Sequence, residues 1–162
     1  MKTNVLEPQT YILIFIFSLL YIAIWIIKRI RKHKNRKNIK KLAKKVKEMT
    51  PENFFKLRNH KIDGGVQYST AHNFSGVYIL YNKTKRMYYI GQAKHIFDRV
   101  NSHLTGKGNG DVYADYKHGD KFTIRLIDLE DSGFLNLNDM ERQAIAAYNA
   151  YTNGYNKTKG NK

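Results

Sequence analysis

The chain has 162 residues, which is enough for one domain and a smaller segment. Its formal net charge of +16 is unevenly distributed: residues 28–50 hold twelve Lys/Arg and one Glu, whereas residues 51–162 hold sixteen Lys/Arg and eleven Asp/Glu. Because the chain has no cysteine, disulfide bonds and thiolate metal sites are excluded.

An apolar run lies near the N-terminus. From Tyr11 to Ile27 the only interruption is Ser18. Seventeen helical residues span about 25 Å, slightly less than the roughly 30 Å core of a bilayer, and flanking residues can make up the difference. We therefore predict a transmembrane helix over residues 10–28. The alternatives are a buried core helix and a cleaved signal peptide, but a signal peptide carries its positive charges in front of the apolar run rather than behind it.

Basic residues follow the apolar run directly, from Lys28 onward. Since positive charge marks the cytoplasmic flank of a membrane helix, residues 1–9 are predicted to be a short extracytoplasmic N-terminus and the rest of the chain to be cytoplasmic. These cations fit two kinds of contact, one with the anionic head groups of the lipid bilayer and one with DNA of any sequence.

Residues 29–73 are predicted to form a basic juxtamembrane helical stalk and a linker. Apolar residues of the stalk recur at intervals of three and four, in a narrow stripe: Ile39, Leu42, Val46 and Met49. Two such repeats do not decide between a single helix and a coiled coil, so a homodimer through the stalk or the membrane helix is one option. The string Thr50-Pro51-Glu52 predicts the start of a short helix, and residues 60–73 read as a loop.

A β-hairpin is predicted next. Val77–Tyr81 and Met87–Ile90 are strand-like, and the polar string Asn82-Lys83-Thr84-Lys85 between them is typical of a turn. Four further elements follow in chain order: a helix over 93–104, a polar loop over 105–120, a strand over 121–129, and a helix from Asn138-Asp139 to about Tyr151. The order β-β-α-β-α predicts an α+β fold, a small three-stranded mixed sheet flanked by helices.

This order and its residues resemble the GIY-YIG nuclease family over residues 74–158, leaving a short tail at 159–162. The string Gly76-Val77-Tyr78 matches the first family motif, with valine in place of the usual isoleucine, and Tyr89-Ile90-Gly91 matches the second. Further family positions fall, in the expected order, on Arg99, His103, Glu141 and Asn156. The resemblance implies catalytic roles for these four residues and for both motif tyrosines.

The resemblance implies hydrolysis of phosphodiester bonds in DNA. Glu141 would hold one divalent cation, Mg²⁺ or Mn²⁺, with waters and the DNA phosphate as the other ligands. Arg99 would hold the scissile phosphate, since a guanidinium offers two parallel donors to two oxygens. Asn156 would brace the site or the DNA. No small-molecule organic cofactor is expected.

The group that activates water is left open between two residues. A free phenol titrates near 10, so Tyr78 needs help from a cation or from His103 to become a base at neutral pH. His103 titrates near 6.5 when unperturbed and could act directly. Tyr89 would orient the water or the phosphate. Residues near the hairpin and in the loop at 105–120 are weaker candidates for DNA contact: Lys85, Lys94, His95 and Lys107.

Three functional hypotheses remain from the sequence. The first is a membrane-tethered DNA endonuclease with a cytoplasmic active domain, acting on incoming phage or plasmid DNA. The second is a non-catalytic, membrane-tethered DNA-binding adaptor on a nuclease fold. The third reverses the topology and places the nuclease outside the cell, which the cations behind the apolar run oppose.

Overall fold

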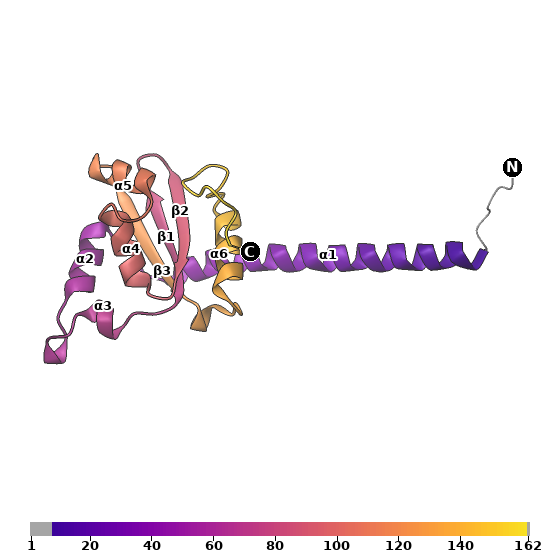
Figure 1. Cartoon of the computed structure of the whole chain (residues 1–162), viewed down its shortest axis with the longest axis horizontal. Coiled ribbons are helices and arrows are strands. Elements are labelled where there is room, and N and C mark those ends of the chain that lie inside the picture. Colours follow the sequence, from indigo (N-terminus) through magenta and orange to yellow (C-terminus); the bar gives the residue numbers. More distant parts are fainter. Residues whose placement is uncertain (1–7, 162) are drawn as a thin grey trace. The chain divides into compact units, whose positions relative to one another are not determined.

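The computed structural model describes the backbone of residues 8–161 and the side chains of residues 9–30 and 38–161. Most of the predicted segment 1–9 and the end of the predicted tail lie outside the described residues. The chain divides into two units, residues 1–35 and residues 36–162 (Figure 1).

Helix α1 runs over Pro8–Lys45, so it supplies the described part of the first unit and enters the second. Within it, Gln9–Ile30 is long and apolar enough to cross a membrane by length and composition, and none of its most apolar stretch is buried. The predicted apolar helix over residues 10–28 is therefore present as a helix.

The second unit contains a three-stranded sheet of β1 (Gly76–Asn82), β2 (Met87–Ala93) and β3 (Phe122–Asp128), in the order β2-β1-β3. This confirms the predicted α+β fold. The prediction of a mixed sheet was wrong in one respect, because both strand pairs are antiparallel. The helical connection does return β3 in the same direction as β2, but β1 lies between them, so no parallel pair is hydrogen-bonded.

Helices surround the sheet: α2 (Pro51–Asn59), α3 (Tyr68–Ala71), α4 (Ile96–Leu104), α5 (Gly110–Lys117) and α6 (Leu137–Ala147), with single 3₁₀ turns at Asp63–Gly65 and Glu130–Ser132. The predicted N-cap of α2 is confirmed, since the Thr50 side chain accepts a hydrogen bond from the Asn53 N–H. Helix α6 begins two residues earlier than predicted, because Asn136 rather than Asn138 caps it.

The predicted loops contain short helices. Residues 105–120 include α5, which is capped by Asn109 and buries Val112, and residues 60–73 include α3. Both helices are too short and too polar for apolar periodicity to reveal them.

Successive side chains of β1 point to opposite faces of the sheet, and a hydrophobic core lies on each face. Val77 and Ile79 face one core, which α6 covers, whereas Tyr78 and Leu80 face the other, which α2, α4 and α5 cover. Figure 1 shows α6 on one side of the sheet and these other helices on the opposite side. The strand and helix positions of Tyr78, Tyr89 and His103 therefore place these side chains on the face that α4 covers.

The apolar stripe of the predicted stalk packs against the rest of the second unit. Ile39 is fully buried in the core under α6, and Leu42 and Val46 pack against that core. Met49 exchanges backbone hydrogen bonds of 3.0 and 2.8 Å with Ile124, so it covers the outer edge of β3. The compact second unit consequently begins at Arg36 and includes much of the predicted stalk and linker.

Candidate active site

Two tyrosines and a histidine meet on the face of the sheet that α4 covers. Tyr89 pairs across the hairpin with Leu80, which lies two residues from Tyr78, so both phenols project from the same face. The Tyr78 hydroxyl lies 2.8 Å from His103 Nε2. The His103 ring centroid is 5.3 Å from that of Tyr78 and 4.8 Å from that of Tyr89. The three side chains, predicted from three separate elements, thus form one cluster.

The hydrogen bonds of His103 define its tautomer. The backbone N–H of Asn109 donates to Nδ1 over 2.8 Å, so Nδ1 carries no proton. A neutral imidazole must then carry its proton on Nε2 and donate it to the Tyr78 oxygen. His103 is therefore a donor toward Tyr78, and it has no free lone pair with which to take the proton of Tyr78.

Burial keeps these groups in their neutral forms. It lowers the pKa of the fully buried His103 imidazole to about 4, and the positive charge of Arg99 acts in the same direction. Burial, together with the neighbouring phenol, raises the pKa of Tyr78 well above its ordinary value, although Arg99 opposes that rise. Burial likewise raises the pKa of Tyr89.

Glycine is required at two positions around this cluster. A Cβ at Gly91, directly across from Tyr78 on β2, would overlap the Tyr78 hydroxyl. A Cβ at Gly108 would overlap the His103 ring, because the chain after α4 folds back over the imidazole. The glycine of the second motif therefore makes room for the phenol of the first.

Arg99 lies on α4 one turn before His103 and is exposed. Among the residues that the structure describes, no carboxylate forms a salt bridge with it. Burial has the largest effect on the pKa of four groups near Arg99. The charge of Arg99 is a smaller effect that lowers each of these pKa values: those of Tyr78, Tyr89, His103 and Glu141. Arg99 is thus close to all of them and accessible to an anion from solvent.

Glu141 lies on α6, on the opposite side of the sheet from α4. Its carboxylate contributes to the raised pKa of Tyr89, and Arg99 acts to lower the pKa of Glu141. Its Oε2 accepts hydrogen bonds of 3.3 Å from Gln92 Nε2 and from the backbone N–H of Asn161. The residue is only 8 % exposed, and burial raises the pKa of its carboxyl, against the effect of these two donors.

The surroundings of Glu141 fit a weakly held hard cation. Gln92 Nε2 and the backbone N–H of Asn161 both donate to Oε2 of Glu141. A carboxylate oxygen is the type of ligand that Mg²⁺ and Mn²⁺ prefer. Within the described part of the chain, no group of three or more His, Asp or Glu side chains could hold a metal. An ion at Glu141 would consequently need ligands from water and substrate, as the sequence predicted.

Asn156 braces strand β2. Its side-chain oxygen accepts from the Ile90 N–H at 2.9 Å, and its amide donates to the Ile90 carbonyl at 2.7 Å. Tyr155 N–H also donates to the Tyr88 carbonyl at 2.9 Å. Both polar atoms of the Asn156 side chain are thus engaged with the strand segment that carries Tyr89 and Gly91.

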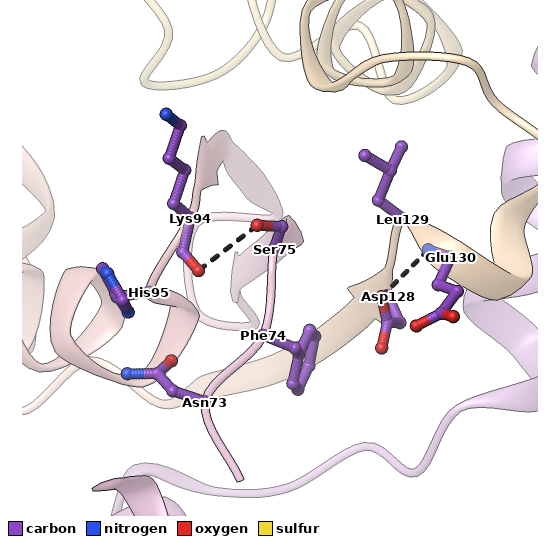
Figure 2. A pocket seen from close by; sticks show the side chains of 8 residues that line it. All are labelled: Asn73, Phe74, Ser75, Lys94, His95, Asp128, Leu129 and Glu130. Atoms are coloured by element: carbon purple, nitrogen blue, oxygen red, sulfur yellow. Dashed lines mark hydrogen bonds between the residues drawn. The ribbon is translucent and has the colours of Figure 1, made fainter.

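The weaker DNA-contact candidates are dispersed. Lys85 forms a 2.5 Å ion pair with Asp115 of α5. Lys94 and His95 line a groove of about 440 Å³ between the start of α4 and the end of β3 (Figure 2). Lys107 is exposed in the segment that folds back over His103. The structure does not draw these four residues into a single patch.

Two residues of the site carried no signal that pointed to them in advance. Gln92 donates to Glu141 and, over 2.6 Å, to Asn138 Oδ1, and it directly follows the second motif. Asn109 contributes its backbone N–H to His103, a group that every residue except proline has. Position next to the motif could have indicated Gln92, but nothing in the side chain of Asn109 indicates its contact.

Comparison with known families identifies the domain that contains these residues. A family model described as the GIY-YIG catalytic domain matches residues 74–156. No curated protein and no solved structure matches the chain. The matched range contains both motif strands and all six predicted site residues, and it covers about half of the chain. The chain therefore belongs to the GIY-YIG family and carries a nuclease-type domain.

Proposed function

We propose that this protein is a membrane-anchored, divalent-metal-dependent DNA endonuclease that hydrolyses phosphodiester bonds on the cytoplasmic side of the membrane. One observation carries the proposal. The Tyr78 hydroxyl lies 2.8 Å from His103 Nε2, the Tyr89 ring lies against the same imidazole, and the exposed Arg99 lies one helical turn before it. With Glu141, whose carboxylate accepts from Gln92 on the edge strand β2, this cluster provides a phosphate anchor, a candidate base and a metal ligand.

Arg99 binds the scissile phosphate. It is exposed and has no carboxylate salt-bridge partner among the described residues, so a phosphate does not have to displace an existing ion pair. A bound phosphate would lie beside Tyr89, whose hydroxyl is placed to orient it or the attacking water. The guanidinium then stabilises the negative charge that develops on the phosphate oxygens.

Tyr78 is the group that activates water in this proposal. His103 is excluded from taking a proton because its Nδ1 already accepts from Asn109 and its Nε2 carries the proton that it donates to Tyr78. Tyr78 would act as the phenolate, after its proton has passed to solvent water, and the same Nε2–H would stabilise the negative charge on the Tyr78 oxygen until that oxygen takes a proton from the attacking water. Arg99 assists, since its charge lowers the pKa that burial raises. For the role that the sequence left open between two residues, we therefore propose Tyr78.

Glu141 would hold the Mg²⁺ or Mn²⁺ ion. The ion supplies charge relief on the phosphate and on the leaving oxygen. Gln92 and Asn161 keep the Glu141 carboxylate in one orientation through Oε2, and their hydrogen bonds favour its ionised form.

The test is cleavage of plasmid and linear DNA by the purified full chain in detergent. We expect cleavage with Mg²⁺ or Mn²⁺ and none with EDTA, and we expect Glu141→Ala to reduce kcat at least 100-fold. Asp63→Ala, which removes an exposed acid outside this cluster, is the matched control and should cut normally. Wild-type protein that binds DNA but cuts none would instead establish the adaptor.

Anchoring and location are the second part of the proposal. The apolar segment Gln9–Ile30 supports a single membrane span, and the cations behind it support a cytoplasmic active domain. An endonuclease held there meets DNA as it enters the cell, which fits a role against phage or plasmid DNA. A protease added to intact cells should leave residues 36–162 uncut, and digestion of that unit would place it outside.

A further inference from the structure

A second groove, of about 670 Å³, opens beside Glu141. Its walls come from the end of β2, the end of β3, the start of α6 and the C-terminal segment. Two of its wall residues, Gln92 and Asn161, are the residues that donate to Glu141 Oε2. The groove therefore adjoins the residues that hold the carboxylate that we assign to the metal.

The walls of this groove are rich in carboxamides. Four of its lining residues have amide side chains: Gln92, Asn136, Asn138 and Asn161. An amide offers both a donor and an acceptor, the combination that matches the edge of a nucleobase. Gln92 Nε2 already donates to Asn138 and Glu141, and Asn136 Oδ1 already caps α6, so Gln92 Oε1 and Asn136 Nδ2 are the groups that these two residues offer to a base edge. No Asp or Glu is among the residues that line the groove, and Lys94 adds a positive charge, so the groove suits part of an anionic strand.

The neighbouring groove has a different character. The two grooves share Ser75, Lys94 and Leu129, but the neighbour adds the carboxylates of Asp128 and Glu130. Figure 2 shows the Lys94 side chain pointing away from those two carboxylates. A phosphodiester backbone would be repelled from that side, which confines a favourable site for nucleic acid to the amide-lined groove.

Leu135 adds an apolar surface to the amide-lined groove. Its side chain is 98 % exposed, the highest value among the large apolar residues whose exposure the structure describes. A single exposed leucine is ordinary in itself. At the wall of this groove, however, it offers an apolar contact, and apolar side chains of this kind insert beside unstacked bases.

From these features we propose that the amide-lined groove binds one nucleoside of the DNA strand, next to the scissile phosphate and out of the base stack. The amides contact the edge of the base, and Leu135 contacts its face. This proposal rests on the proposed endonuclease function and names its substrate class, DNA with an unpaired nucleotide at the cleavage point. In a paired duplex the edge and the faces of the base are already occupied, and removing a base from the stack costs least where it is mismatched or single-stranded.

The experiment uses the full chain in detergent micelles with labelled leucine and valine methyl groups and labelled Asn and Gln side-chain amides. A single-stranded DNA pentanucleotide is titrated in Ca²⁺, and a paired duplex of 12 base pairs serves as the comparison. We expect the pentanucleotide to shift the Leu135 methyl signals and the side-chain amide signals of Asn136, while the signals of Val66 stay in place. Shifts that avoid Leu135 and Asn136 would overturn the proposal.

Kinetics on two variants supply the second readout. Leu135→Ser alters an exposed side chain, and Asn136→Ser keeps the N-cap acceptor of α6 while removing the amide. Each should raise KM for a mismatched or single-stranded substrate about fivefold or more, leave kcat within twofold, and reduce the preference over paired duplex. Val66→Ser, which changes an exposed apolar residue elsewhere, is the control. Equal KM values for wild type and both variants would overturn the subsite.

The outcomes separate this proposal from the proposed function. Normal cleavage with no shift at the groove would remove the subsite and leave the endonuclease. A protein that cuts no form of DNA would remove the endonuclease, whereas the titration would still decide whether the groove binds a nucleoside.

Discussion

At the scale of single residues, His103 is held by two hydrogen bonds that a glutamine can reproduce. A glutamine amide nitrogen can donate to Tyr78, and its oxygen can accept from the Asn109 N–H. If His103 acts only as a donor, His103→Gln should keep kcat within about tenfold of wild type, while His103→Ala should lose roughly 100-fold, the usual cost of one preorganised donor. DNA cleavage in Mg²⁺ checks this, with thermal unfolding of both variants as the control for folding. Equal losses in the two variants would show that the imidazole itself transfers a proton.

The buried imidazole also makes stability depend on pH. His103 stays neutral in the folded protein down to about pH 4, whereas in the unfolded chain it takes up a proton below about pH 6.5. The free energy of unfolding should therefore fall as the pH decreases from 6.5 to 4, by about 3 kcal/mol from this group, with no further loss below pH 4.

Urea unfolding of wild type and His103→Gln in the same detergent, at pH 7 and pH 4, measures this effect. The difference between the two proteins isolates the histidine, because the carboxylates titrate in both. We expect the wild type to lose about 3 kcal/mol more than the variant over this range. Parallel losses in the two proteins would contradict the burial of a neutral imidazole.

At the scale of elements, the edge strand β2 depends on a side chain from the C-terminal segment. Asn156→Asp keeps the acceptor for the Ile90 N–H but replaces the amide that donates to the Ile90 carbonyl with a second acceptor. One hydrogen bond is lost and two oxygens are opposed, so the free energy of unfolding should fall by about 2 kcal/mol. Because Ile90 lies between Tyr89 and Gly91, kcat should fall as well.

Thermal and urea unfolding check the change in stability, and Asn153→Asp, at an exposed position three residues earlier, is the matched control. If Asn156 served DNA binding instead, the variant would raise KM and unfold like the control.

The elements that could be predicted from the sequence are those with a strong local pattern. The hairpin could be predicted because two strand-like runs flank a polar turn, and each motif tyrosine could therefore be assigned to one face of the sheet. Helix α5 could not be predicted, since Val112 is its single buried residue and one residue shows no periodicity. The stripe at Ile39 and Leu42 was visible as a stripe, but spacing alone does not say which surface it covers, and it covers the protein's own core. The contact of Gln92 with Glu141 joins residues 49 positions apart, which no local pattern reports.

At the scale of the whole molecule, the net positive charge is distributed unevenly along the chain. The basic segment after the apolar helix holds most of the net positive charge, whereas the nuclease-type domain is only mildly basic. A mildly basic domain binds DNA weakly at physiological salt, because affinity depends on the number of phosphates that it neutralises. Confinement beside the membrane would compensate, since it raises the local concentration of the domain on DNA that crosses there and lowers it in the bulk chromosome.

Deletion of residues 1–30 tests this effect of confinement directly. The deletion leaves the compact unit of residues 36–162 whole, so cleavage per molecule in vitro should stay within about twofold of the full chain. In cells, the same deletion should abolish protection against phage or plasmid DNA, because the freed domain is diluted through the cytoplasm. Fusing an unrelated membrane helix of the same orientation to the deletion variant should restore protection. Plaque counts and transformation efficiencies measure both results. Full protection by the soluble variant would mean that the membrane does not set where this nuclease acts.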